Sequence, residues 1–382
     1  MDDKTTITSI MVHFESLNDP RRVHLRQHRL LDILTIAICA VICNCEAWDE
    51  VELWGEANEA WLKTFLELPN GIPSHDTFNR VFRLLEPAEL QRCMSEWMAV
   101  LQTEHGLKII AIDGKTLRGS YDRASCRSAL HLVSAWAVEN HISLGQVAVD
   151  DKSNEITAIP ELLKIIDVSE AIVTIDAVGC QKDIATAIRR QKGDYVLALK
   201  DNQPTLATAV TELFQQGIET AFAGQNYELW ETKGTSHGRW EHRTYEVLRR
   251  VTGLPDQALW ADLCSVVCVT RIARENGKET SDVRYYISSR DATAELFSRA
   301  IRGHWGIEST LHWTLDVTFH EDASRLRKDH GPQNMALLRK IAISLLKNET
   351  TKKKLSLKRK RLLAGWDLDY LLTILFPKLQ KK

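Results

Sequence analysis

Two aspartates in this sequence directly follow apolar runs that are typical of buried strands. Asp113 follows IIAI in KIIAIDGKTLRGS, and Asp176 follows IVTI in AIVTIDA. An aspartate after a strand is common turn chemistry, so either residue alone is compatible with a turn. Two carboxylates at neighbouring strand ends would repel each other unless a cation lay between them. The pair therefore points to a site for a divalent metal ion.

A third carboxylate is expected from a helix further along the chain. Glu308 in RGHWGIESTLHW is the best-placed candidate, and three nearby acids compete with it: Asp316, Glu321 and Asp322. A set of Asp, Asp and Glu suits Mg²⁺ or Mn²⁺, which prefer oxygen ligands. Two such ions would activate a water or 3'-hydroxyl and stabilise the leaving oxygen in phosphodiester cleavage or strand transfer.

Histidines flank this glutamate at helical spacing. In one continuous helix His304, Glu308 and His312 would share a face, because they are spaced four residues apart. That pattern permits a His-Glu-His zinc site, but the two aspartates favour a hard cation. We expect these histidines to contact phosphate or to orient the glutamate.

The elements around these residues follow a recognisable order. From Lys108 the pattern predicts three strands, a helix, a strand, a helix and a strand, which is the order of the RNase H-like fold. We expect an α/β protein in five parts: a helical domain over 1–107, the first part of an RNase H-like core with a mixed sheet over 108–203, a β-rich insertion over 204–291, a core helix with the third carboxylate over 292–348, and a basic tail over 349–382.

Composition limits the class of protein. The 382 residues are 44% hydrophobic and 26% charged, with a formal net charge of -2, as in a soluble globular protein without a global pull toward nucleic acid. The eight cysteines form no CxxC pair, which favours buried thiols over a zinc site. We see no signal peptide and no apolar run long enough to cross a bilayer. We expect a cytoplasmic protein.

Cationic and polar groups at several places could contact DNA. Helical SHDTFNRVFRLL has Ser74 as a candidate N-cap and could be a recognition helix, although the pattern favours a solvated face on an ordinary bundle helix. Other candidates lie beyond strand ends, on a hairpin tip and beside Glu308. The full set is Asn79, Arg80, Arg83, Lys115, Arg118, Lys200, Asn202, Lys233, His237, Arg239, Arg302 and His304. Each alone is compatible with a solvated surface position.

The last 33 residues are strongly basic. The segment from Thr350 to Lys382 has ten Lys or Arg residues and two acids, and TKKKLSLKRKR stands at its start. Such a run is usually a solvated or disordered tail. In a DNA enzyme it would add non-specific affinity that falls steeply with salt.

At these residues the sequence resembles the bacterial H-repeat-associated proteins and the related insertion-sequence transposases of the DDE class. The matching stretches, in order, include NGIPSHDTFNRVF, IAIDGKTLRGSYD, VTIDAVGCQKDIA, DYVLALKDNQ and HWGIESTLHWTLDVTFHED. The resemblance implies metal-dependent cutting and joining of double-stranded DNA at inverted repeats. It also implies a catalytic triad of Asp113, Asp176 and Glu308, and a multimer in the synaptic complex that acts on the nucleoid.

Two positions depart from the broader transposase pattern, which has an arginine four residues before the glutamate and a lysine seven after it. Here His304 and Leu315 occupy those places, and Arg302 is the nearest candidate for the missing cation. End processing, with or without a hairpin, is therefore left open. A DNA-binding relic without catalysis and a nuclease that cuts without joining are the alternative functions.

Overall fold

The computed structural model describes residues 12–99, 108–122, 128–149, 153–236 and 238–376. Their contacts divide the chain into two compact units. Unit 1 comprises Met1–Gly106, Gly114–Asp151 and Glu308–Lys382, and unit 2 comprises Leu107–Asp113 and Lys152–Ile307. The prediction of a helical N-terminal region followed by a mixed α/β fold is confirmed.

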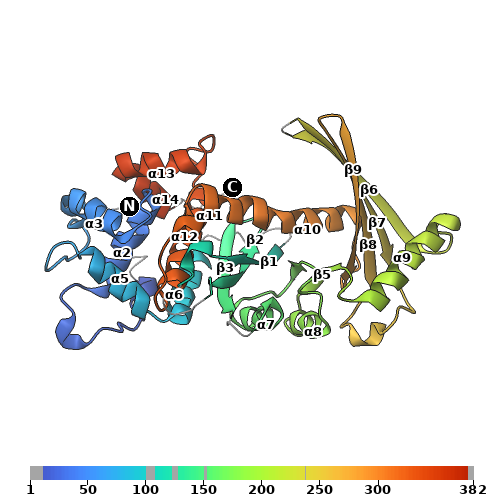
Figure 1. Cartoon of the computed structure of the whole chain (residues 1–382), viewed down its shortest axis with the longest axis horizontal. Coiled ribbons are helices and arrows are strands. Elements are labelled where there is room, and N and C mark those ends of the chain that lie inside the picture. The colour runs from blue at the N-terminus through green and yellow to red at the C-terminus, as the bar shows by residue number, and fades with distance from the viewer. Residues whose placement is uncertain (1–11, 100–107, 123–127, 150–152, 237, 377–382) are drawn as a thin grey trace. The chain divides into compact units, whose positions relative to one another are not determined.

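Unit 1 is built around one long, almost wholly buried helix, α12 (Gly331–Asn348). Helices that precede and follow it in sequence pack on it, which makes it the core of the helical part (Figure 1). The helices that contact it are α2 (Leu30–Ile42), α5 (His75–Leu84), α6 (Pro87–Ala99), α11 (Trp313–Val317), α13 (Leu357–Trp366) and α14 (Leu368–Leu375). Helix α3 (Trp48–Ala57) packs on α2 and α5, and the short α4 (Glu59–Leu62) contacts α3. The antiparallel strands β2 (His131–Ala137) and β3 (Ile142–Val149) complete the unit.

Unit 2 has a parallel core and a long antiparallel extension. Strand β1 (Lys108–Thr116) pairs in parallel with β4 (Ala171–Ile175), which pairs in parallel with β5 (Asp194–Leu199). Helices α7 (Glu155–Ile165) and α8 (Lys182–Arg190) lie on one face of these strands, and α10 (Ala294–Gly306) packs on β4 from the other (Figure 1). The adjacency of the first and fourth strands is that expected for the RNase H-like core.

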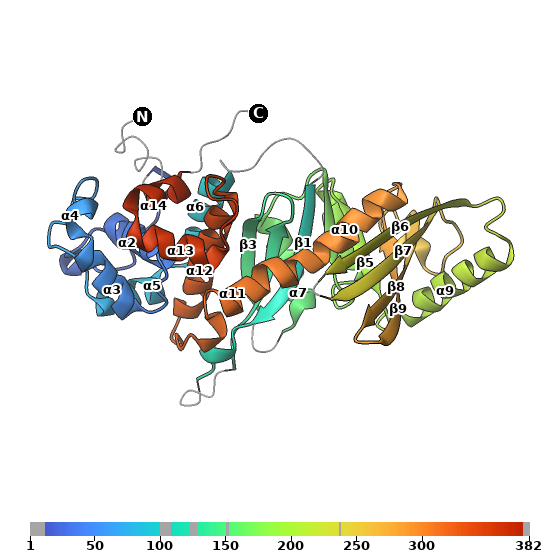
Figure 2. The same ribbon diagram turned by 90° about the horizontal axis from the view of Figure 1, so that it is seen from above.

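The predicted β-rich insertion extends the same sheet. Its strands are β6 (Asn226–Ser236), β7 (Arg239–Arg249), β8 (Ser265–Glu275) and β9 (Lys278–Ser288), and they follow helix α9 (Pro204–Glu219) (Figure 2). β9 pairs antiparallel with β5. The whole sheet has nine strands in the order β3-β2-β1-β4-β5-β9-β8-β7-β6.

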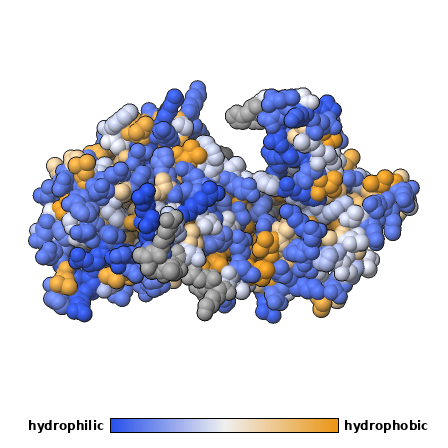
Figure 3. All heavy atoms as spheres, viewed as in Figure 1, coloured by the Kyte–Doolittle hydropathy of each residue, from blue (hydrophilic) through white to orange (hydrophobic). Residues whose placement is uncertain are grey.

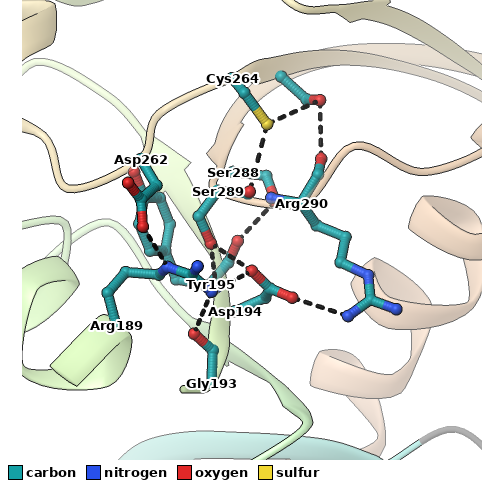
Figure 4. A network of polar contacts seen from close by, with 10 residues as sticks. Arg189, Gly193, Asp194, Tyr195, Asp262, Cys264, Ser288, Ser289 and Arg290 are labelled. Carbon is teal, nitrogen blue, oxygen red and sulfur yellow. Dashed lines mark hydrogen bonds and ion pairs between the residues drawn. The ribbon is translucent and has the colours of Figure 1, made fainter. Parts of the chain in front are cut away.

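A polar network joins the start of β5 to the end of β9 (Figure 4). Asp194 accepts hydrogen bonds from Arg189 Nη1 at 2.6 Å, Ser289 Oγ at 2.9 Å and Arg290 Nη1 at 2.8 Å. Because Asp194 is largely buried, these three donors offset the cost of taking its carboxylate out of water. The network therefore fixes the extension on the core sheet.

No helix among the described residues is long and apolar enough to cross a membrane. On the face drawn in Figure 3, apolar residues are scattered among hydrophilic ones. The seven cysteines in the described part of the chain are free thiols, and six of them are buried. This agrees with the prediction of buried thiols.

Candidate active site at the carboxyl ends of β1 and β4

Asp113 and Asp176 occupy equivalent places on two neighbouring parallel strands. Ile112 of β1 is paired with Ile175 of β4, and each aspartate is the next residue along its chain. β1 does not end at Asp113 as predicted, because it continues to Thr116 beyond the last residue paired with β4. What ends there is the buried stretch of β1, so Asp113 begins its partly exposed part.

Backbone donors hold the Asp176 carboxylate. Its Oδ1 accepts hydrogen bonds from the N–H groups of Val178 at 3.0 Å and Gly179 at 3.3 Å. Burial raises the pKa of Asp176, and the nearby negative charge of Glu155 raises it further. The two N–H groups and the positive charge of Lys200 lower it, but the net shift is upward. A cation bound at this carboxylate would act in the opposite direction and favour its charged form.

The turn after Asp176 needs a glycine. A Cβ on Gly179 would lie 2.3 Å from Ile175 Cγ2, which is closer than real side-chain contacts allow. Asn202, which follows β5, donates from Nδ2 to Ala177 O at 2.6 Å and to Cys180 O at 3.5 Å. Asn202 thus fixes the loop that carries Asp176, a role that the prediction of a DNA contact did not foresee. Lys200, just after β5, is exposed.

His304 packs against β4 near the carboxyl end of that strand. Its Nδ1 lies 3.3 Å from Thr174 Oγ1, on the face of β4 that α10 covers. Burial lowers the pKa of His304 to about 4, so its imidazole is neutral at pH 7. A neutral ring orients neighbours but brings no charge to a phosphate, whereas Arg302, two residues earlier, is exposed.

Glu308 stands where the predicted long helix changes its geometry. Thr293 is the N-cap of α10, and its Oγ1 accepts a hydrogen bond from Leu296 N. The π-helical turn η4 (Ile307–His312) follows α10, and Glu308 is exposed within it. The expectation that His304, Glu308 and His312 share one face assumed α-helical spacing throughout, and with a π-helical turn from Ile307 to His312 it stays a prediction. Single π-turns inside helices are frequent at functional sites.

The chemical type of the available ligands, carboxylate oxygens, suits a hard cation. Asp113 and Asp176 offer carboxylate oxygens from paired strands, as Mg²⁺ and Mn²⁺ require. Among the described residues, no group of three or more His, Cys, Asp or Glu side chains is close enough to hold a metal ion. The fit therefore rests on the two aspartates, and the part of Glu308 remains a prediction.

Two cations that follow Asp113 differ sharply. Lys115 Nζ lies 2.7 Å from Asp316 and 3.3 Å from Asp322, and its side chain is 10% exposed. Burial lowers the pKa of Lys115, but the surrounding carboxylates outweigh it and the net shift is upward. Arg118 is 81% exposed, 3.5 Å from Asp322. Of these two cations, Arg118 is the one that presents its charge to solvent.

The predicted recognition helix is an amphipathic helix packed on its neighbours. α5 buries Phe78, Val81 and Phe82, and Ser74 takes the N-cap position without a capping hydrogen bond. Arg83 binds Asp329 through Nε and Nη2. On the remaining polar positions, Arg80 is exposed and Asn79 is half-buried.

The hairpin predicted to reach DNA is formed by β6 and β7. Lys233 pairs with Glu231 at 3.2 Å and Arg239 with Glu241 at 3.2 Å, while His237 lies outside the described residues. Sequence reasoning missed Arg243 and Arg271, which also bind Glu241, at 2.8 and 2.6 Å. The alternation of Arg239, Glu241 and Arg243 in RWEHRTYEVLR was the available signal, since alternate residues share a face of a strand.

The basic segment is not a tail over residues 357–375, because α13 and α14 form there. Lys360 is buried and donates to the carbonyls of Leu346 and Glu349, and it lies 3.0 Å from the Glu349 carboxylate. Arg361 pairs with Glu46 at 2.8 Å and is fully buried. These acceptors replace water around the two cations, which allows a basic run to fold into the core.

Comparison with known proteins decides the family. The family description "Transposase DDE domain" matches residues 104–345, and "DDE_Tnp_1-associated" matches residues 11–98. The chain belongs to the DDE transposase family. A DDE domain implies a phosphoryl-transfer enzyme and generally implies the use of divalent metal ions.

Relatives of this DDE protein cover nearly its whole length. It is 40% identical over 378 residues to the H repeat-associated protein YhhI of Escherichia coli K12, which covers 97% of this chain and 98% of the relative. The K12 protein YbfL matches with the same identity and coverage. The solved piggyBac transposase synaptic complex with hairpin DNA aligns with 98% of this chain and 79% of its own, at 11% identity and a TM-score of 0.42. Likeness at that level says nothing further about function.

Proposed function

We propose that this protein cuts and joins double-stranded DNA at the inverted repeats of an insertion-sequence element. The catalytic residues are Asp113, Asp176 and Glu308. The observation that carries the proposal is the pairing of Ile112 with Ile175, which puts two aspartates side by side at the ends of neighbouring strands. Membership of the DDE family supports a phosphoryl-transfer reaction at these carboxylates.

Under this proposal the three carboxylates hold Mg²⁺ or Mn²⁺, in a pair of ions. Bound ions would polarise the scissile phosphate and activate the attacking hydroxyl. The chain's own residues prepare the site. The N–H groups of Val178 and Gly179 fix the Asp176 carboxylate, and Asn202 holds the loop behind it.

DNA is the partner, both as element ends and as target, and the active form is a homo-oligomer in a synaptic complex. The exposed cations Lys200, Arg302 and Arg118 are the candidates for phosphate contacts around the carboxylates. Phosphate contacts of this kind position DNA without reading its sequence. The sequence of the inverted repeats must therefore be recognised elsewhere on the protein.

The test is cleavage of DNA that carries the flanking ends of the gene, with Mg²⁺ or Mn²⁺. Wild type should cut, whereas Asp176→Ala and Glu308→Gln should bind the DNA and leave it intact. Asp183→Ala, which removes an exposed aspartate in the first turn of α8, is the matched control and should cut normally. Wild type that binds but never cuts would favour a relic, and cut ends that are never joined would favour a nuclease.

A further inference from the structure

Two segments that adjoin predicted catalytic residues are bound to each other within unit 1. One follows Asp113 and contains Lys115, and the other follows Glu308 and contains Asp316, Glu321 and Asp322. Lys115 Nζ lies 2.7 Å from Asp316, 3.3 Å from Asp322 and 3.7 Å from Glu321. One ammonium thus joins three carboxylates from the second segment.

The surroundings make this contact a buried one. Lys115 is 10% exposed and Glu321 is 1% exposed, while Asp316 and Asp322 are 37% and 28% exposed. Water screens charges much less at such depth than at an exposed pair. Two negatively charged partners within 3.3 Å also occupy the donors that a DNA phosphate would need.

A second contact joins the same segments through the backbone at Gly119. The backbone at Gly119, in the 3-10 turn η2 (Arg118–Ser120), lies against the backbone that follows η5 (Glu321–Ala323). A Cβ on Gly119 would lie 2.2 Å from Ser324 O and 2.9 Å from Asp322 O. Arg327 Nε also donates to Gly119 O at 3.4 Å. The two segments are therefore in close contact over several residues.

We propose that Lys115 is a positioning residue for the cleavage reaction: it binds the strand that carries Asp113 to the segment that follows Glu308. Lys115 lies two residues after Asp113, and Asp316 lies eight residues after Glu308. Without this link, the strand that carries Asp113 and the segment that follows Glu308 would no longer be held together. Each of them adjoins one predicted metal ligand. The proposal rests on the function proposed above, and it replaces the earlier prediction that Lys115 contacts the DNA backbone.

The test compares Lys115→Met, Lys115→Arg and Asp316→Asn in DNA binding and in cleavage at saturating DNA. Lys115→Met should cut roughly ten- to a hundredfold more slowly, as when a residue that supports a metal ligand is lost. It should also require more Mg²⁺, while the affinity for DNA and its salt dependence stay those of wild type. Lys115→Arg should restore most of the rate, and Asp316→Asn should show a smaller loss of the same kind.

Lys63→Met is the matched control, because it removes an exposed lysine that pairs with Glu59 at 2.8 Å on the surface of unit 1. It should leave cleavage unchanged. A phosphate contact by Lys115 would instead lower DNA affinity and reduce the salt slope by roughly one, with normal cleavage at saturating DNA. That result would overturn the proposal.

Amide hydrogen exchange separates this proposal from the proposed function. Lys115→Met should speed exchange in peptides that cover residues 108–116 and 313–323, and Lys115→Arg should not. Unchanged exchange in Lys115→Met would overturn the positioning role even if wild type cuts DNA. Wild type that fails to cut would refute the proposed function while leaving this structural test intact.

Discussion

Two charged clusters in this protein are opposite in composition. Around Lys115, three carboxylates surround one cation, and the ammonium is 10% exposed. Around Glu241, three guanidinium groups surround one carboxylate: Arg239 at 3.2 Å, Arg243 at 2.8 Å and Arg271 at 2.6 Å. These arginines are 38%, 18% and 22% exposed.

The difference shows that the sign of the surplus charge, rather than the presence of a cation, decides what a cluster can do. The cluster at Lys115 has no positive charge left for a polyanion, so its use is to hold segments together. The cluster at Glu241 has a positive surplus on partly exposed strands. Burial lowers the pKa of Arg243, and the nearby charge of Arg302 lowers it further. A surplus of that sign attracts DNA.

The largest expected difference between the clusters is in stability. Lys115→Met leaves three carboxylates facing one another, one of them buried, and should lower the free energy of unfolding by about 3–4 kcal/mol. Glu241→Gln disturbs a more exposed group and should cost about 1 kcal/mol. Urea unfolding measures both. Equal costs would show that the two clusters do not differ in the way their burial indicates.

A smaller effect should appear in the pH dependence of stability near the Lys115 cluster. Buried Lys340 donates to Ser134 and Gln146, and burial lowers its pKa to about 8, against Glu321, which raises it. Between pH 8 and 10.5 the unfolded chain binds the proton that folded Lys340 has lost, so unfolding becomes harder as pH rises. From pH 8 to 9.5 the gain is about 1.6 kcal/mol, because folded Lys340 is already half deprotonated at pH 8.

Lys340→Met is the control for that measurement, because it removes the titrating group and keeps most of the volume of the side chain. Unfolding in urea at several pH values should show the rise in wild type and its absence in the variant. A wild type whose stability falls or stays level from pH 8 to 9.5 would contradict the lowered pKa of Lys340.

The smallest expected effect is on DNA binding by the cluster at Glu241. If this surface meets DNA, Arg271→Ala should weaken binding by about 1 kcal/mol and reduce the salt slope by roughly one. Glu241→Gln should steepen the slope, because it adds to the positive surplus. Fluorescence anisotropy at several salt concentrations measures both. If neither variant changed the affinity or the salt slope, this cluster would not contact DNA.

Local pattern allowed much of the fold to be predicted. Strand and helix periodicity gave the order of the elements, and the buried run before Asp176 gave the end of β4. Three features were missed because they depend on partners distant in sequence. They are the continuation of β1 to Thr116, the enclosure of Lys115 by acids some 200 residues away, and the folding of α13 around Glu46 and Glu349.

The π-helical turn was not predicted, for a different reason. The sequence around Glu308 is a good α-helical pattern, and the change to i→i+5 bonding leaves no mark in hydrophobic spacing. The predicted shared face of His304, Glu308 and His312 assumed α-helical spacing throughout, and it stays a prediction. The placement of Asp113 beside Asp176 could be predicted because strand pairing constrains both positions, while their role as metal ligands stays a prediction.

The most direct test of the metal-dependent function is the cleavage of element-end DNA by Asp176→Cys in Mg²⁺ and in Mn²⁺. A thiolate binds the softer Mn²⁺ better than Mg²⁺. If Asp176 is a metal ligand, the variant should be inactive in Mg²⁺ and regain part of the wild-type rate in Mn²⁺, whereas Asp176→Ala stays inactive in both. Wild-type rates for Asp176→Cys in Mg²⁺, or an equal loss in both metals, would contradict a metal at Asp176.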